Sequence, residues 1–161
     1  MRMLPLPSQE ELLASFTYDP LTGALVRKLT GNTIKSVDGK GYFMLQYKGV
    51  AFKSHRIIWK MYYGYDPDQV DHINGDRADN RLVNLRIATH GENCQNSKVR
   101  KHSHTGLKGV GYDSRRGLWR ARINVEGKKN WLGYFNSPEE AHAAYCKAAK
   151  ELHGDFFRPQ S

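Results

Sequence analysis

The residues best suited to chemistry lie between positions 70 and 97 of this 161-residue chain. Asp71 and His72 are adjacent, Asn84 follows twelve residues after the histidine, and Asn93 follows twenty-one residues after it. A carboxylate and an amide suit Mg²⁺ or Mn²⁺, because these cations take oxygen ligands and keep several waters. A neutral imidazole beside such a cation can take a proton from water near pH 7. The spacing therefore favours metal-assisted hydrolysis, with a metal-free structural loop as the alternative.

Short elements must position these side chains. The sequence predicts a strand ending near 69–70, a tight turn at 74–76, a second strand at 85–87 and a helix that starts near Thr89. Neighbouring residues on a strand point to opposite faces. Asp71 and His72 therefore serve one site only if the chain bends there or the site straddles the end of the strand.

This order of strand, loop, strand and helix, with those polar residues, resembles the HNH endonucleases of the ββα-metal type, in particular the homing-type members found in phages. The preceding stretch HRIIWKMYYGYDP (55–67) is similar to the helix that comes before the Asp-His pair in that family. The resemblance implies that His72 is the general base and that Asp71 and Asn93 bind one Mg²⁺ or Mn²⁺. It further implies that Asn84 holds the His72 loop through side-chain-to-backbone hydrogen bonds. The expected products are a 5′-phosphate and a 3′-hydroxyl.

The charge of the chain is unevenly distributed. It has 25 basic and 16 acidic residues, for a net charge of +9. Residues 1–94 contribute 12 basic and 10 acidic groups, whereas residues 95–161 contribute 13 and 6. A basic surface of this kind favours a polyanionic partner, with nucleic acid the leading candidate and a solvated surface kept for solubility as the alternative.

The C-terminal third has its own pattern. Three β-like runs within 108–135 are separated by SRRG and EGKK, which are typical of hairpin turns. A helix is expected after Ser137, an N-cap residue followed by a proline at the first helical position. We expect its apolar face to consist of Ala141, Ala144, Tyr145, Ala148 and Leu152.

This third resembles the Apetala-two DNA-binding domain of plant ethylene-response transcription factors. The matching stretches are KGVGYD, WRARI, WLGYF and EEAHAAYCKAA. The resemblance implies a DNA face made of Lys108, Tyr112, Arg120, Arg122, Asn124, Lys129 and Trp131. Gly111 and Tyr112 stand where that family often has more arginine, so the base preference is left open. We expect further DNA contacts from Arg86 and from three linker residues, Lys98, Arg100 and Lys101.

The whole chain is expected to have an α+β fold, with a helix and hairpin region (1–54), the HNH motif (55–97), a basic linker (98–104) and the sheet-plus-helix domain (105–161). A capped helix over 8–16 and a hairpin turning at Lys48-Gly49 are expected in the first region. The second region is expected to begin with a helix that Gly64 closes.

Several classes are disfavoured by the sequence. It has no apolar run long enough to span a membrane and no signal-peptide segment, and its two cysteines do not make a disulfide framework. We therefore expect a cytoplasmic protein with no membrane partner. The resemblances imply that it is encoded by a phage, acts in the host cell cytoplasm and has double-stranded DNA as its partner. A single ββα site cuts one strand at a time, so a monomeric nickase is expected, with a dimer as the alternative. The rival function is a non-catalytic, sequence-specific DNA-binding regulator on the same scaffold; an RNA-directed nuclease is a third hypothesis.

Overall fold

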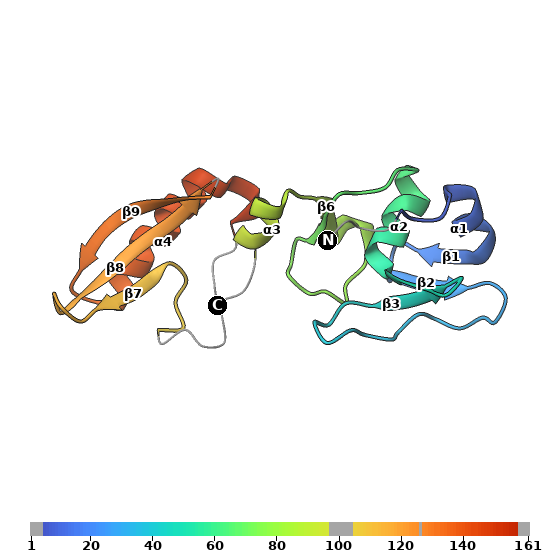
Figure 1. The fold of residues 1–161 in the computed structure, drawn as a ribbon, viewed down its shortest axis with the longest axis horizontal. Coiled ribbons are helices and arrows are strands. Elements are labelled where there is room, and N and C mark those ends of the chain that lie inside the picture. Colours follow the sequence, from blue (N-terminus) through green and yellow to red (C-terminus); the bar gives the residue numbers. More distant parts are fainter. Residues whose placement is uncertain (1–4, 97–104, 126, 158–161) are drawn as a thin grey trace. The chain divides into compact units, whose positions relative to one another are not determined.

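The structure, a computed structural model, describes residues 5–96, 105–125 and 127–157, and these fall into two compact units divided after Thr89. Each unit combines helices with antiparallel strands, which confirms the α+β class (Figure 1). No helix in these ranges is long and apolar enough to cross a membrane.

The first unit begins with a helix and two hairpins. In chain order these elements are α1 (Gln9–Ser15), β1 (Phe16–Asp19), β2 (Ala24–Arg27), β3 (Met44–Tyr47), β4 (Val50–Lys53) and α2 (Ser54–Tyr63). The Ser8 hydroxyl accepts a hydrogen bond from the Glu11 amide, so the predicted N-cap is confirmed. Lys48 and Gly49 both have positive φ, as a two-residue hairpin turn requires, and Gly64 ends α2 in the left-handed conformation.

A single apolar core joins these elements. It includes Leu12 of α1, Phe16 of β1, Leu25 of β2 and the neighbouring pair Ile57 and Ile58 of α2, all at most 2% exposed. Burying a side chain of this size contributes about 1.5–3 kcal/mol to folding. The hairpins and α2 therefore form one support for the segment that follows.

The predicted site segment lies on that support. The strands β5 (Val70–His72) and β6 (Leu85–Ile87) pair antiparallel, with the 3-10 turn η1 (Leu82–Asn84) just before β6. Val70 and Leu85 enter the core of the first unit. Asp71 and His72 belong to β5 itself, one residue or two beyond the expected strand end, and both side chains are buried, at 5% and 3% exposed. Asp71 pairs with Arg86 of β6, and His72 contacts Asn80 of the loop that follows β5.

The second unit begins with α3 (His90–Gln95). A three-stranded sheet then follows, with β7 (Val110–Asp113), β8 (Leu118–Val125) and β9 (Lys128–Phe135) in that spatial order, and the unit ends with α4 (Pro138–His153) and η2 (Gly154–Phe156). Ser137 caps α4 by accepting from the Glu140 amide, which confirms the predicted start of this helix. The predicted linker at 98–104 lies outside the described residues.

The buried face of α4 differs from the expected one. Ala141, Tyr145, Ala149 and His153 are buried, whereas Leu152 is 51% exposed. The prediction was wrong at the end of the helix because it selected residues by hydrophobicity. It therefore chose Leu152 for the buried face, where the structure has the polar His153. A repeat of four residues, rather than mixed steps of three and four, keeps one line of side chains against the twisted sheet.

Candidate active site and nucleic-acid interface

His72 lies at the centre of a buried polar cluster in the first unit. Its Nε2 atom is 3.1 Å from Oδ1 of Asn80, a residue that is itself only 1% exposed. An amide oxygen only accepts hydrogen bonds, so Nε2 carries the proton in this arrangement and Nδ1 carries the lone pair. The asparagine therefore fixes the tautomer that leaves one ring nitrogen basic.

The electrostatic environment keeps His72 neutral. Burial lowers its pKa below the ordinary 6.5, and this effect outweighs the opposing hydrogen bond that the ring donates to Asn80 and the negative charges of Asp71, Asp76 and Asp79. A histidine that is neutral at pH 7 is ready to accept a proton.

Two rings pack against the imidazole of His72. The His55 ring meets it edge-on with centroids 5.0 Å apart, and the Tyr42 ring lies 5.8 Å away. His55 is 4% exposed, and its pKa is lowered well below 6.5, first by burial and then by neighbouring positive charges that include Lys53 and Arg56. The His72 ring is thus held by flat, uncharged neighbours on one side and by Asn80 on another.

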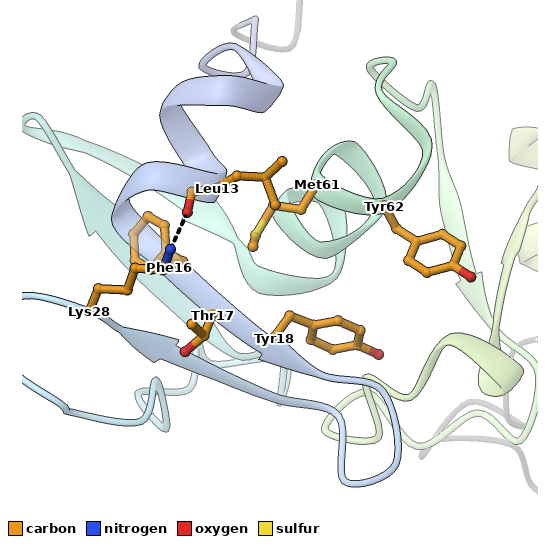
Figure 2. Close-up of a pocket in the computed structure, with 7 residues that line it drawn as sticks. All are labelled: Leu13, Phe16, Thr17, Tyr18, Lys28, Met61 and Tyr62. Carbon is orange, nitrogen blue, oxygen red and sulfur yellow. Dashed lines mark hydrogen bonds between the residues drawn. The ribbon is translucent and has the colours of Figure 1, made fainter.

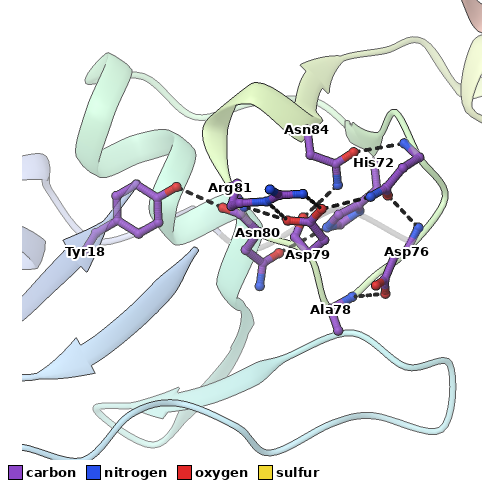
Figure 3. Close-up of polar contacts among 9 residues, drawn as sticks. Tyr18, His72, Asp76, Ala78, Asp79, Asn80, Arg81 and Asn84 are labelled. Atoms are coloured by element: carbon purple, nitrogen blue, oxygen red, sulfur yellow. Dashed lines mark hydrogen bonds and ion pairs between the residues drawn. The ribbon is translucent and has the colours of Figure 1, made fainter. Parts of the chain in front are cut away.

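Asn84 closes the loop that carries these groups. Its Oδ1 atom accepts from the Asn74 amide at 2.9 Å and its Nδ2 donates to the Asp79 carbonyl at 2.8 Å, so both bonds run from side chain to backbone. The Asp79 carboxylate in turn accepts from Asn74 Nδ2 and from both Nε and Nη2 of Arg81. Figure 3 shows these contacts gathered around His72. Several side-chain hydrogen bonds therefore hold the loop over 73–81 in one conformation.

The N-terminal hairpin supports the same loop from outside the motif. The Tyr18 hydroxyl donates to the Asn80 carbonyl at 2.9 Å (Figure 3). Gly23, with φ +75°, lies so close that a Cβ atom there would be 2.7 Å from the Arg81 nitrogen. The turn between β1 and β2 thus lies directly against the backbone that presents Asn80.

Asp71 is engaged by Arg86. Both Nε and Nη2 of Arg86 donate to Oδ2 of Asp71, at 3.0 and 2.9 Å, across the β5–β6 pair. The Arg86 side chain is only 16% exposed. The residue expected to contact DNA is therefore placed beside the residue expected to bind metal.

The residues around His72 include oxygen donors that suit a divalent cation. Within the described residues, no three histidine, cysteine, aspartate or glutamate side chains gather in a group that would hold a metal. Mg²⁺ needs no such group, because it accepts a single carboxylate together with amide, water and phosphate oxygens. The Asp71 carboxylate in the first unit is an oxygen donor of this kind, so its chemistry fits. Asn93 lies on α3, in the second unit.

A separate pocket of about 400 Å³ lies between α1, β1 and α2. Phe16, Met61 and Tyr62 line it, together with Lys28, whose Nζ donates to the Leu13 carbonyl (Figure 2). Its lining contains none of the residues that the sequence marked for chemistry.

The second unit exposes a polar face of its sheet. Ala121 and Ile123 of β8 are buried beneath α4, while Arg122 and Asn124 are exposed on the opposite face. Trp131 of β9 lies opposite Arg122, and Lys129 lies opposite Asn124. Cross-strand partners share one face, so these four side chains form a single surface.

The other expected DNA residues are placed less uniformly. Tyr112 is 53% exposed and stacks on Trp119, and Lys108 is partly buried. Arg120 is partly buried with its Nε close to Gly111, where a Cβ atom would approach to 3.1 Å. The glycine therefore gives Arg120 room to lie across β7. The three linker residues Lys98, Arg100 and Lys101 fall outside the described residues.

Asn80 is the residue that sequence reasoning missed, because asparagine in a loop is typical of turns and caps. The signal available was its place in the sequence DNRLVN, between the paired residues Asp79 and Arg81. Nothing in that sequence indicates that its side chain turns inward to His72.

Comparison with known proteins agrees with this arrangement. The model of an HNH endonuclease family matches residues 52–95, and the model of the AP2 domain matches residues 105–155. Protein 3.8 of Escherichia phage T7 is 35% identical over 112 residues, which cover 67% of this chain and 90% of that protein. None of the solved structures matches. The resemblances found in the sequence are thereby confirmed, and the two domains indicate DNA as the partner. The chain belongs to the same family as the T7 protein and carries an HNH endonuclease domain followed by an AP2 domain.

Proposed function

We propose that the protein is a divalent-metal-dependent DNA endonuclease of the homing type, which nicks duplex DNA as a monomer in the cytoplasm of a phage-infected bacterium. The observation that carries this proposal is the buried, neutral His72, held by Asn80 in the tautomer that leaves Nδ1 basic, within a segment matched by the HNH family. The phage relative supports the setting.

The chemistry assigned to the chain is a hydrolysis. His72 takes a proton from a water molecule, the resulting hydroxide attacks phosphorus, and the bond to the 3′-oxygen breaks, with the leaving oxygen taking a proton from solvent water. Mg²⁺ or Mn²⁺, bound through Asp71 and Asn93, would stabilise the negative charge on the phosphate and on the leaving oxygen. Asn84 keeps the His72 loop closed through its two bonds to backbone atoms. The products are a 5′-phosphate and a 3′-hydroxyl.

DNA binding is assigned mainly to the sheet of the second unit. Arg122, Asn124, Lys129 and Trp131 form its exposed face, and a sheet of this width enters a major groove. Lys108, Tyr112 and Arg120 extend that surface along β7 and β8. We retain the linker cations Lys98, Arg100 and Lys101 as phosphate contacts.

The test is a plasmid assay. With Mg²⁺, supercoiled DNA should become nicked circles before linear DNA appears, and EDTA should stop the reaction. His72→Ala should lower the rate by about 10²–10⁴-fold, the usual contribution of a general base. His142→Ala, which removes a histidine from α4, serves as the matched control and should retain the rate. Cleavage that persists in the His72 variant would refute the assignment of the base.

One observation favours a second function. Because Arg86 binds the Asp71 carboxylate, the fold is stable with that carboxylate engaged by the protein itself. A DNA-binding regulator without catalysis would need nothing more. Tight DNA binding with no cleavage of any DNA, under any divalent cation, would support that alternative.

A further inference from the structure

A cluster of cations surrounds Tyr42, the ring that packs on His72. Lys53 Nζ lies 3.9 Å from the centroid of the Tyr42 ring, and the Arg77 guanidinium carbon lies 4.9 Å from it. Both distances are within the range of cation–π attraction. Lys53 ends β4, whereas Arg77 comes from the loop over 73–81, so two separate segments place positive charge at one ring. We call Lys53, Arg77 and Tyr42 the basic cluster.

The basic cluster has a local excess of positive charge. Burial lowers the pKa of Lys53, and the positive charges of Lys40, Arg77 and Arg56 lower it further, against the opposing charge of Asp38. Among the residues that the structure describes, no carboxylate oxygen lies within 4.0 Å of either Lys53 or Arg77. Like charges gathered in this way favour an anion that enters from outside.

The nearby carboxylate is already engaged by backbone groups. Oδ1 of Asp38 accepts from the Lys40 amide at 2.8 Å and from the Tyr42 amide at 3.0 Å. Asp38 thus shapes the turn before β3 instead of forming an ion pair with the cluster. The negative charge of Asp38 reduces the positive potential at the basic cluster. It does not cancel that potential, because the neighbouring cations outnumber this one carboxylate.

Arg77 is held in place but keeps an exposed position. Its Nη1 donates to the Lys40 carbonyl at 2.8 Å, which uses one of the five N–H donors of a guanidinium. The residue is exposed, whereas Lys53 is half-buried against Tyr42. A ligand reaching this cluster from solvent would meet Arg77 first and then lie close to the ring that contacts His72.

We propose that Lys53 and Arg77 bind a backbone phosphate of DNA beside His72, and that Tyr42 positions this phosphate relative to the imidazole. The proposal rests on the proposed function, because it assigns the substrate phosphate to the same site. Arginine and lysine are the side chains that bind phosphate most strongly, the one as a fork and the other as a point charge. Phosphates of one strand recur every 3.4 Å or so along the helix axis, so the bound phosphate lies within a few nucleotides of the bond that is cut.

The test combines charge-removing variants with neutral phosphates. Once the nick is mapped, duplexes are made with one methylphosphonate at each position around it. For the native protein, kcat/KM should fall about tenfold or more at one or two of these positions. The double variant Lys53→Gln/Arg77→Gln should cut the unmodified duplex about 10–100-fold more slowly, and it should be insensitive to the methylphosphonate at those positions.

Matched variants separate phosphate binding from loss of fold or of general charge. Lys28→Gln/Lys35→Gln removes two exposed cations from the same unit and should retain both the rate and the methylphosphonate pattern. Lys53→Arg/Arg77→Lys keeps both charges and should recover at least part of the rate. Thermal unfolding of each variant shows whether the first unit is intact.

The outcomes are distinct. A slow double variant that remains as sensitive as the native protein at every position would show that the cations only brace Tyr42, and the proposal would fail. It would fail equally if the double variant were as fast as the native protein.

If the native protein cuts no DNA, the endonuclease function fails first, and the phosphate contact is then judged by binding. Loss of the contact to this one phosphate should reduce the slope of log Kd against log salt concentration by about 0.9, with no change for the Lys28/Lys35 control. An unchanged slope in the double variant would overturn the contact as well.

Discussion

At the scale of single residues, the site depends on how His72 is held. One ring nitrogen is committed to Asn80, two flat rings pack beside the imidazole, and burial keeps it uncharged. Together these features hold the imidazole in one orientation, with the lone pair on Nδ1. In the proposed reaction, the role of His72 as base therefore depends on its contact with Asn80.

The Asn80 contact leads to a direct prediction. In Asn80→Ala the imidazole loses its partner and is free to turn or change tautomer, so cleavage should fall about tenfold or more. The free energy of unfolding should also fall by about 1–3 kcal/mol, because a buried donor is left without its acceptor. Plasmid nicking and urea unfolding measure the two effects, with the exposed Asn32→Ala as control. Unchanged cleavage in the Asn80 variant would show that the imidazole needs no such partner.

Asp79 provides a prediction about pH. Its hydrogen bonds, first of all those from Arg81, lower the pKa of its carboxyl from 3.8 to about 2. A depressed carboxyl pKa stabilises the fold above the unfolded value, and this contribution is lost as pH falls from about 4 to 2. Asp79→Asn should therefore cost about 1 kcal/mol at pH 7, a figure reduced for the exposure of Arg81, and almost nothing near pH 2. Urea unfolding of both proteins across this range decides it, and a gap that stays constant with pH would contradict it.

At the scale of elements, the sequence predicted local structure well and long-range contacts poorly. The cap at Ser8, the turn at Lys48-Gly49 and the start of α4 depend on neighbours within four residues, so composition and spacing reveal them. The packing of Tyr18 on the Asn80 carbonyl joins residues 62 positions apart. No local pattern encodes such a contact.

The candidate site shows the same division. The spacing of Asp71, His72 and Asn84 predicted which polar side chains the β5–β6 pair and its loop carry. The ion pair of Arg86 with Asp71 was not foreseen, because it depends on the register of β5 against β6, which places the two residues opposite each other. Pairing register is set by three-dimensional packing, and the short strands carry too few residues to reveal it.

The turn between β1 and β2 predicts an effect at the catalytic loop. Gly23→Ala should destabilise the protein by more than about 2 kcal/mol, since the new Cβ meets the Arg81 nitrogen and a positive φ is itself unfavourable. Gly31→Ala, at φ +68° with open space around it, carries only the conformational cost of about 1–2 kcal/mol. Cleavage should drop in the Gly23 variant and stay near normal in the Gly31 variant. Equal behaviour of the two variants in unfolding and nicking assays would contradict this role for the turn.

At the scale of the whole molecule, charge and chemistry are divided along the chain. The residues placed around His72 belong to the first unit, whereas 13 of the 25 basic residues lie in 95–161. Affinity for DNA should therefore come mainly from the second unit, and turnover mainly from the first. A change in either can be read out separately by binding and by cleavage.

Salt dependence tests this division. If the protein neutralises about six phosphates, log K should fall with log salt concentration at a slope of about −5. Arg122→Gln, on the exposed face of β8, should reduce the steepness by about 1, while Lys147→Gln on α4 should leave it unchanged. Fluorescence anisotropy with a duplex at several salt concentrations provides the measurement. If the Lys147 variant lost slope instead, the DNA would lie on the α4 side of the sheet and the prediction would be wrong.

Gly23, at the β1–β2 turn, also limits which segments of related genes can recombine into a working protein. The match to the HNH endonuclease family starts at residue 52, but Gly23 and Tyr18 contact the loop over 73–81 from well before that border. A gene exchange between phages with its crossover at residue 52 would join the HNH motif of one protein to the N-terminal hairpin of another. The β1–β2 turn of that hairpin would have evolved against a different loop. Successful recombinants should therefore carry both segments from one parent, or compensating substitutions at positions 18, 23 and 80.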